Sequence, residues 1–214
     1  MGAMFSINSK FMSGLNRIVD IVFLNLIFIV TCIPIFTIGA SITALYTVTL
    51  KLASHDEIYV VKTYIKSFKL NFKQSTKVWL IEVAAFLIIY IEMRICRDFD
   101  FFFKIPVLFI LCCLLIVFGI SIIFVFPIIA KIDAPLKNIF INSICIPLSN
   151  LAAMITVILI QVVPLIMVIN SGRLFDLWCY LVIMGWFAFI SYMSSFYINK
   201  MLSKFISTEY INRN

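Results

Sequence analysis

Long apolar runs alternate with short polar stretches along the whole chain. The runs lie at about 18–33, 37–53, 78–93, 105–130, 147–169 and 176–198. They lack the two-residue alternation of barrel strands, and most are long enough for a helix that crosses a bilayer. We therefore predict an all-α fold: a polytopic helical membrane protein with about six transmembrane helices in a single membrane domain, residues 1–214.

The first two runs are separated by a predicted break at Pro34 and Gly39. A single helix over 18–53 would be roughly 54 Å long at ~1.5 Å per residue. A hydrocarbon core is only about 30 Å thick. We therefore expect two short antiparallel helices joined at Pro34–Gly39, which either cross the membrane twice or form a re-entrant hairpin. Further along, Pro147 is expected to separate an interfacial stretch, 138–146, from the fifth span.

Composition supports a membrane protein and excludes an ordinary soluble enzyme. Hydrophobic residues make up 64% of the chain and charged residues 13%, against about 45–50% and 25% in soluble domains. The six cysteines are dispersed and only one histidine is present, so we expect no metal site and no cofactor. Enzyme motifs such as GxSxG or HExxH are missing. We therefore expect that the protein is not an enzyme and that it has no nucleic-acid partner.

Basic residues predict the orientation of the chain. If the N-terminus is cytoplasmic and the chain crosses six times, only Arg94, Arg97, Lys104 and Arg173 of the 17 basic residues fall outside. Because cytoplasmic loops carry the excess of Lys and Arg, this arrangement places both termini in the cytoplasm.

A basic amphipathic helix is predicted over 54–77. Ser54 and Glu57 have the spacing of a capping box, and lysines follow along one stripe. This set, called here the lysine stripe, consists of Lys62, Lys66, Lys69, Lys73 and Lys77. Phe68 and Phe72 follow on an adjacent face. Such a helix either rests on anionic lipid or docks a protein partner, and we name these seven residues as candidate docking residues.

Polar residues inside apolar runs are candidates for function, since they are costly in lipid. We select Asp20, Asn25, Glu82 and Gln161. The simplest structural roles are an i,i+3 pair of Asp20 with Arg17, pairing or snorkelling of Glu82 toward the inner surface, and interhelical hydrogen bonds from Asn25 and Gln161.

A set of short motifs lies in the first two thirds of the chain. They are Asn16-Arg17, Asp20, Leu24-Asn25-Leu26, Pro34, Thr37-Ile38-Gly39-Ala40-Ser41, Ala44-Leu45-Tyr46, Ser67-Phe68-Lys69, Asn71-Phe72-Lys73 and Phe126-Pro127. With these motifs the chain resembles the YesL-like family of small bacterial membrane proteins, most strongly over 11–77. The resemblance implies a protein of the bacterial plasma membrane, encoded near carbohydrate-uptake and glycan-degradation genes, and it carries over no catalytic residue.

Together these features favour an accessory subunit of a carbohydrate-uptake system, with the lipid bilayer and an uptake permease as partners. The alternatives are a self-sufficient small-solute transporter, or a membrane sensor or scaffold that regulates glycan utilisation. A transporter should contain a polar cavity that reaches the middle of the membrane. An accessory subunit should lack one and present a lateral face for helix packing.

Overall fold

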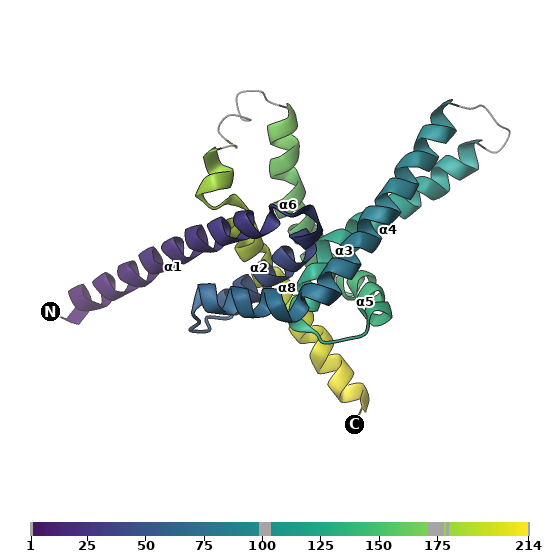
Figure 1. Cartoon of the computed structure of the whole chain (residues 1–214). Coiled ribbons are helices and arrows are strands. Elements are labelled where there is room, and N and C mark those ends of the chain that lie inside the picture. Colours follow the sequence, from purple (N-terminus) through teal and green to yellow (C-terminus); the bar gives the residue numbers. More distant parts are fainter. Residues whose placement is uncertain (1, 99–103, 171–177, 179, 214) are drawn as a thin grey trace.

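A computed structural model describes residues 2–98, 104–170, 178 and 180–213 of the chain. Its elements are α1 (Gly2–Cys32), the 3₁₀-helix η1 (Ile35–Thr37), α2 (Ile38–Ala53), α3 (Val60–Asp98), α4 (Lys104–Lys131), α5 (Leu136–Leu148), α6 (Leu151–Asn170) and α8 (Trp186–Arg213). Within these ranges the fold is all-helical, as predicted (Figure 1). Among the described residues, three segments, 35–53, 105–131 and 151–169, are long and apolar enough to cross a membrane, so six crossings are not confirmed.

α2 forms the centre of the molecule. Its apolar segment is 67% buried within the chain, whereas the segments in α4 and α6 are only 17% buried. α2 runs beside α3, and hydroxyl pairs join the two helices: Thr43 Oγ1 lies 2.9 Å from Ser75 Oγ, and Thr47 Oγ1 lies 2.7 Å from Ser67 Oγ. On another side Ser195 of α8 donates to Thr49 Oγ1 at 2.9 Å. α2 is therefore a core helix of the protein, while most of the apolar surface of α4 and α6 is not covered by other parts of the chain.

The turn between α1 and α2 is fixed by local hydrogen bonds. α1 ends at Cys32, and the chain reverses at residues 33–37, around Pro34. The Thr37 hydroxyl donates a bifurcated hydrogen bond to the carbonyl oxygens of Thr31 and Pro34, each 2.6 Å away. The backbone carbonyl groups freed by the proline break are thereby satisfied in part.

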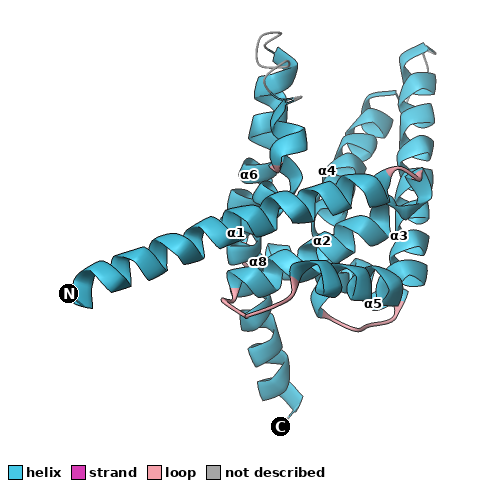
Figure 2. Cartoon of the chain, turned by 60° about the vertical axis from the view of Figure 1, so that its left-hand side comes forward, coloured by secondary structure: helices cyan, strands magenta, loops and turns pink. Residues whose placement is uncertain are grey.

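This turn lies part of the way along α3. The indole Nε1 of Trp79 donates to the carbonyl oxygen of Ile35 across 3.0 Å. From Trp79, α3 continues to Asp98, which is roughly 28 Å at ~1.5 Å per residue. Figure 2 shows the turn beside α3, well below the upper end of that helix. The α1–α2 hairpin thus lies beside the first half of α3 and stops well before the end of that helix at Asp98.

The predicted capping box at Ser54 is wrong. The N–H groups of Ser54, His55 and Asp56 donate to carbonyl oxygens in the last turn of α2, so these residues end that helix. His55 adopts a φ of 62°, the left-handed conformation found after many helix ends. α3 then begins at Val60 and runs without a break to Asp98. Residues 60–77 of the basic segment predicted as a separate helix over 54–77 are therefore the first half of α3, and residues 54–59 connect α2 to it.

Two later elements also differ from the predicted spans. Pro147 lies inside α5, which ends at Leu148, and the break follows at residues 149–150. The predicted span 176–198 is not one helix: residues 180–184 are helical, Gly185 has a φ of +143°, and α8 starts at Trp186. Residues with a β-carbon rarely adopt that φ. Residues 176, 177 and 179 lie outside the described part of the chain.

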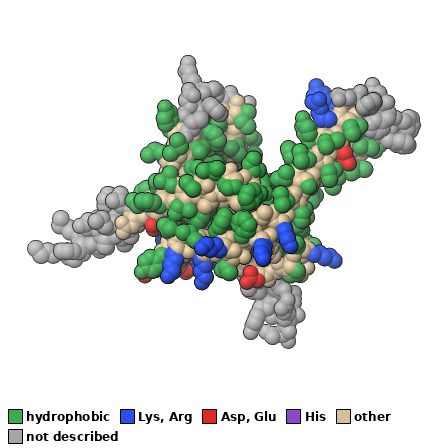
Figure 3. Space-filling model, in the orientation of Figure 1, with side chains coloured by type: hydrophobic (Ala, Val, Ile, Leu, Met, Phe, Trp, Pro, Cys, Tyr) green, Lys and Arg blue, Asp and Glu red, His purple; other side chains and the backbone are tan. Residues whose placement is uncertain are grey.

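Two arms rise from the α2 core and diverge (Figures 1 and 2). We call the upper parts of α3 and α4 the α3–α4 arm, and α6 with residues 180–184 the α6 arm. Phe86 and Phe118 stack within the first arm, with ring centroids 6.3 Å apart. The exposed side chains of both arms are mainly hydrophobic (Figure 3), as expected for segments that face lipid or another membrane protein.

Candidate functional site

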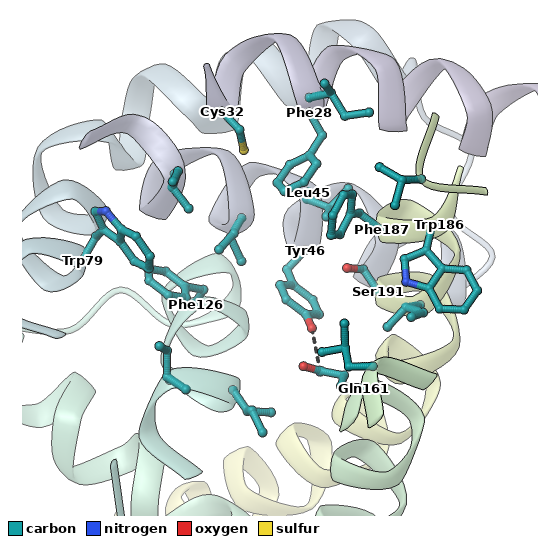
Figure 4. A pocket seen from close by; sticks show the side chains of 18 of the residues that line it. Phe28, Cys32, Leu45, Tyr46, Trp79, Phe126, Gln161, Trp186, Phe187 and Ser191 are labelled. Carbon is teal, nitrogen blue, oxygen red and sulfur yellow. Dashed lines mark hydrogen bonds between the residues drawn. The ribbon is translucent and has the colours of Figure 1, made fainter. Parts of the chain in front are cut away.

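An apolar cavity of about 640 Å³ lies at the base of the two arms. We call it the interarm cavity. Its walls come from α1, α2, α3, α4, α6, Val182 and α8, and they include Phe28, Leu45, Trp79, Phe126, Leu165, Trp186 and Phe187. Figure 4 shows Trp79 and Phe126 on one side, and Trp186 and Phe187 on the other. Aromatic and aliphatic side chains thus dominate the wall, and the volume lies within the range of pockets that bind other molecules.

A small polar group lies within this apolar lining. Gln161 Nε2 of α6 donates a hydrogen bond to the hydroxyl of Tyr46 on α2, 3.0 Å away (Figure 4). Tyr46 is only 5% exposed, and Ser191 of α8 also hydrogen-bonds to it. Gln161 therefore makes an interhelical bond, and the cavity offers an occupant only a few hydrogen-bonding groups.

Tyr46 was not among the residues selected from the sequence. Its position in the apolar run Ala44-Leu45-Tyr46 marks it as an aromatic core residue, which it is. Its role as a hydrogen-bond acceptor in the cavity wall depends on Gln161, which lies 115 positions later in the sequence. Only the way the helices pack brings that partner to it.

Asn25 lies at a different place, against the break before α8. Its Nδ2 donates to the carbonyl oxygens of Val182 and Ile183, at 2.8 and 3.4 Å. Its Oδ1 accepts from the backbone N–H of Ala188 at 3.3 Å. Asn25 is fully buried. The side chain thus supplies backbone hydrogen bonds that the interruption at Gly185 removes from the helix ladder.

Glu82 lies at a third place, between α3, α4 and α5. It is 3% exposed, and its Oε1 accepts a hydrogen bond from Ser121 Oγ across 2.8 Å. Ser121 Oγ is 3.3 Å from Ser143 Oγ. The expectation that Glu82 snorkels toward the inner surface is therefore wrong, because its carboxyl group is buried against Ser121 of α4, on which α5 packs. Burying a carboxyl group requires such polar partners.

Asp20 and its neighbour Arg17 are half-buried on α1. Arg17 Nη1 donates to the hydroxyl of Tyr192 on α8 at 3.2 Å, and its guanidinium lies 5.9 Å from the centroid of that ring. Arg17 also interacts electrostatically with Asp20, in line with the i,i+3 spacing. Arg17 thus joins α1 to α8, and neither Arg17 nor Asp20 lines the interarm cavity.

The structure therefore separates the intramembrane polar candidates. Asn25, Glu82 and Gln161 have different partners, and of the three only Gln161 lines the interarm cavity. They do not form one polar path through the described part of the chain. Within that part, no group of three or more His, Cys, Asp or Glu side chains could hold a metal ion.

The lysine stripe is exposed along the first half of α3. Figure 3 shows Lys and Arg side chains along the lower edge of the molecule, below the hydrophobic surface. Phe68 and Phe72 are half-buried. Phe68 stacks on the fully buried Tyr64 with ring centroids 6.4 Å apart, and its ring lies 5.5 Å from that of Phe72. Packing within the protein therefore already accounts for much of the surface of Phe68.

Comparison with known families identifies one matching segment. Residues 21–93 match the model of a family described as a protein of unknown function, DUF624. The matched segment contains the second part of α1, all of α2 and most of α3, and hence Asn25, Pro34, Gly39, Tyr46, Glu82 and the lysine stripe. No match was found among curated proteins or among solved structures.

Proposed function

We propose that this chain is an accessory membrane subunit, and that the interarm cavity receives side chains from a transmembrane helix of a partner protein. The observation that carries the proposal is the cavity itself. It lies where two apolar arms diverge, and its walls are almost entirely hydrophobic. In lipid, helices associate by close packing and by a few interhelical hydrogen bonds. The Tyr46–Gln161 pair offers such a bond within an otherwise apolar wall.

The lining favours a protein helix over a polar solute. A sugar presents many hydroxyl groups, and a site that binds one needs several hydrogen-bonding partners. The described cavity lining provides few, and Asn25 and Glu82 lie elsewhere. These features fit the accessory-subunit hypothesis better than a self-sufficient solute transporter. The YesL-like motifs in the sequence suggest a carbohydrate-uptake permease as the partner.

We further propose how the chain lies in the membrane. The end with the lysine stripe faces the cytoplasm of a bacterial cell, since basic residues collect on that side. The α3–α4 arm crosses the bilayer, because α3 extends roughly 28 Å past Trp79 and a hydrocarbon core is about 30 Å thick. The α1–α2 turn, held at Trp79, then stays near the cytoplasmic leaflet as a re-entrant hairpin.

Affinity purification of the full chain from its native membranes in mild detergent tests the partner. The informative variant is Leu165→Trp, which places a large ring in the cavity. Val163→Trp is its matched control, because Val163 is 42% exposed against 43% for Leu165 but does not line the cavity. We expect an uptake permease to co-purify with the unchanged chain and with Val163→Trp, and to be lost with Leu165→Trp. Equal recovery from both variants, or no permease with the unchanged chain, would contradict the proposal.

A further inference from the structure

We propose that a second pocket, at the end of the molecule that carries the lysine stripe, binds a phosphate group. The pocket has a volume of about 470 Å³. Three lysines from three helices line it, together with hydroxyl and amide side chains. We call it the basic pocket, and its polar lining consists of Thr47, Lys51, Thr63, Lys66, Ser67, Asn71, Gln74, Lys131 and Asp133.

Convergence of Lys51, Lys66 and Lys131 is the first observation behind this proposal. Lys51 lies in the last turn of α2 and Lys131 is the last residue of α4. A cation is favourable at a helix C-terminus, so each of these two has a local reason for its position. Lys66 lies inside α3, away from any helix C-terminus, so this effect does not account for its position. These three lysines are exposed, and the lining sets the one carboxylate of Asp133 against their three ammonium groups. The excess of positive charge favours an anion at the pocket.

The second observation is that the pocket wall is held in place by hydrogen bonds. Ser67 Oγ lies 2.7 Å from Thr47 Oγ1, and Asn71 Nδ2 donates to both the carbonyl and the hydroxyl oxygen of Ser67 at 3.2 Å. Gln74 Nε2 donates to the carbonyl oxygen of Ala134 across 2.8 Å, which fixes the α4–α5 connection against α3. Polar groups fixed in this way need little reordering when an anion binds.

The chemistry of the lining indicates a phosphate ester. The ammonium groups of Lys51, Lys66 and Lys131 can donate charge-assisted hydrogen bonds to phosphate oxygens. The Thr47 hydroxyl already donates to the carbonyl oxygen of Thr43 at 2.9 Å, so it accepts from Ser67, and the protons of these two hydroxyl groups hold the pocket wall. Asp133 lowers the positive charge of the pocket but leaves it in excess. The volume exceeds that of a phosphate ion, so there is room for the group that carries it. That group is either the headgroup of an anionic lipid or a soluble phosphate compound.

The lysine stripe supplies the matched control. Lys66 lines the pocket, whereas Lys69 and Lys73 lie on the same face of α3 and do not line it. All three are exposed, so replacing any of them with glutamine should leave the fold intact. A surface that attracts anions only through its net charge would respond equally to the loss of each lysine.

The experiment uses the full chain in lipid nanodiscs and has two arms. In phosphatidylcholine nanodiscs, inorganic phosphate is titrated by calorimetry. In nanodiscs of phosphatidylcholine and phosphatidylglycerol, native mass spectrometry measures the phosphatidylglycerol that stays bound. Binding in the first arm identifies a soluble phosphate compound as the ligand class, and retention in the second alone identifies a lipid headgroup.

In whichever arm shows binding, we expect Lys66→Gln and Lys131→Gln each to weaken it by about tenfold, the loss expected when one charge-assisted hydrogen bond is removed. Lys69→Gln and Lys73→Gln should change it by less than about twofold. Equal losses for pocket and control lysines would overturn the proposal, as would the lack of binding in both arms.

Discussion

Gly39 of α2 lies against Trp79 of α3 with no room for a side chain between them. A β-carbon at Gly39 would lie 2.7 Å from Trp79 Cβ and 2.6 Å from the carbonyl oxygen of Ser75. The same position is 3.1 Å from the Phe126 ring of α4. The start of α2 can therefore pack between α3 and α4 only because residue 39 is glycine. This contact also holds the α1–α2 turn at the level of Trp79.

We predict that Gly39→Ala destabilises the protein by about 1–3 kcal/mol, the usual cost of overpacking a tight helix contact. Thermal unfolding in detergent measures the effect. Gly119→Ala in α4 is the control, because a β-carbon at Gly119 would have no neighbouring atom within 4 Å. Its unfolding should stay within about 1 kcal/mol of the unchanged chain. A similar loss in both variants would mean that helix geometry, and not the close approach, limits position 39.

Asn25 is predicted to stabilise the interrupted helix before α8. Asn25→Ala removes hydrogen bonds to Val182, Ile183 and Ala188 and leaves buried backbone groups without partners, at a cost of about 1–3 kcal/mol. Thr156→Ala on α6 removes only an exposed hydrogen bond within its own helix and should be nearly neutral. If thermal unfolding showed no difference between the two variants, Asn25 would not be the residue that stabilises the break.

Glu82 is predicted to act as a buried hydrogen-bond acceptor. In Glu82→Gln the amide oxygen can still accept from Ser121, so stability should fall by no more than about 1 kcal/mol. Glu82→Ala removes the acceptor and leaves a void, and should cost about 2–4 kcal/mol. Thermal unfolding of the two variants checks this order. If Glu82→Gln were as damaging as Glu82→Ala, the negative charge itself would be required.

The re-entrant hairpin is tested by cysteine labelling in a background without the native cysteines. Ile35 is 74% exposed and Leu70 is 72% exposed within the protein, so a difference in labelling reports position relative to the bilayer. A membrane-impermeant maleimide added outside cells should label Arg97→Cys but not Ile35→Cys or Leu70→Cys. A permeant maleimide should label Leu70→Cys. Strong labelling of Ile35→Cys from outside would show that the first two helices cross the membrane.

The helical class was predictable because it depends on the length of apolar runs and on the spacing of proline. Those signals are local. The start of α3 was mispredicted for a local reason as well: the residues that resemble a capping box instead donate N–H bonds to the end of α2, with His55 in the left-handed conformation. Two helix signals competed for the same residues, and the sequence does not show which one prevails.

The candidate site was much less predictable. Asn25 and Gln161 were selected as polar residues in apolar runs, but their partners lie 157 and 115 positions away. The basic pocket shows the same limit. Lys66 belongs to a visible helical stripe, whereas Lys51 and Lys131 join it only because the ends of α2 and α4 meet α3. Helix packing, which hydropathy does not encode, decides both sites.

The most direct test of the central claim is photocrosslinking from the interarm cavity in native membranes. A photoreactive amino acid is placed at Leu165, which lines the cavity, or at Val163, which does not. The two positions are two residues apart on α6 and almost equally exposed. We expect one discrete crosslinked product between Leu165 and a carbohydrate-uptake permease, and no such product from Val163. The same permease product from both positions, or crosslinks to lipid alone from Leu165, would contradict that claim.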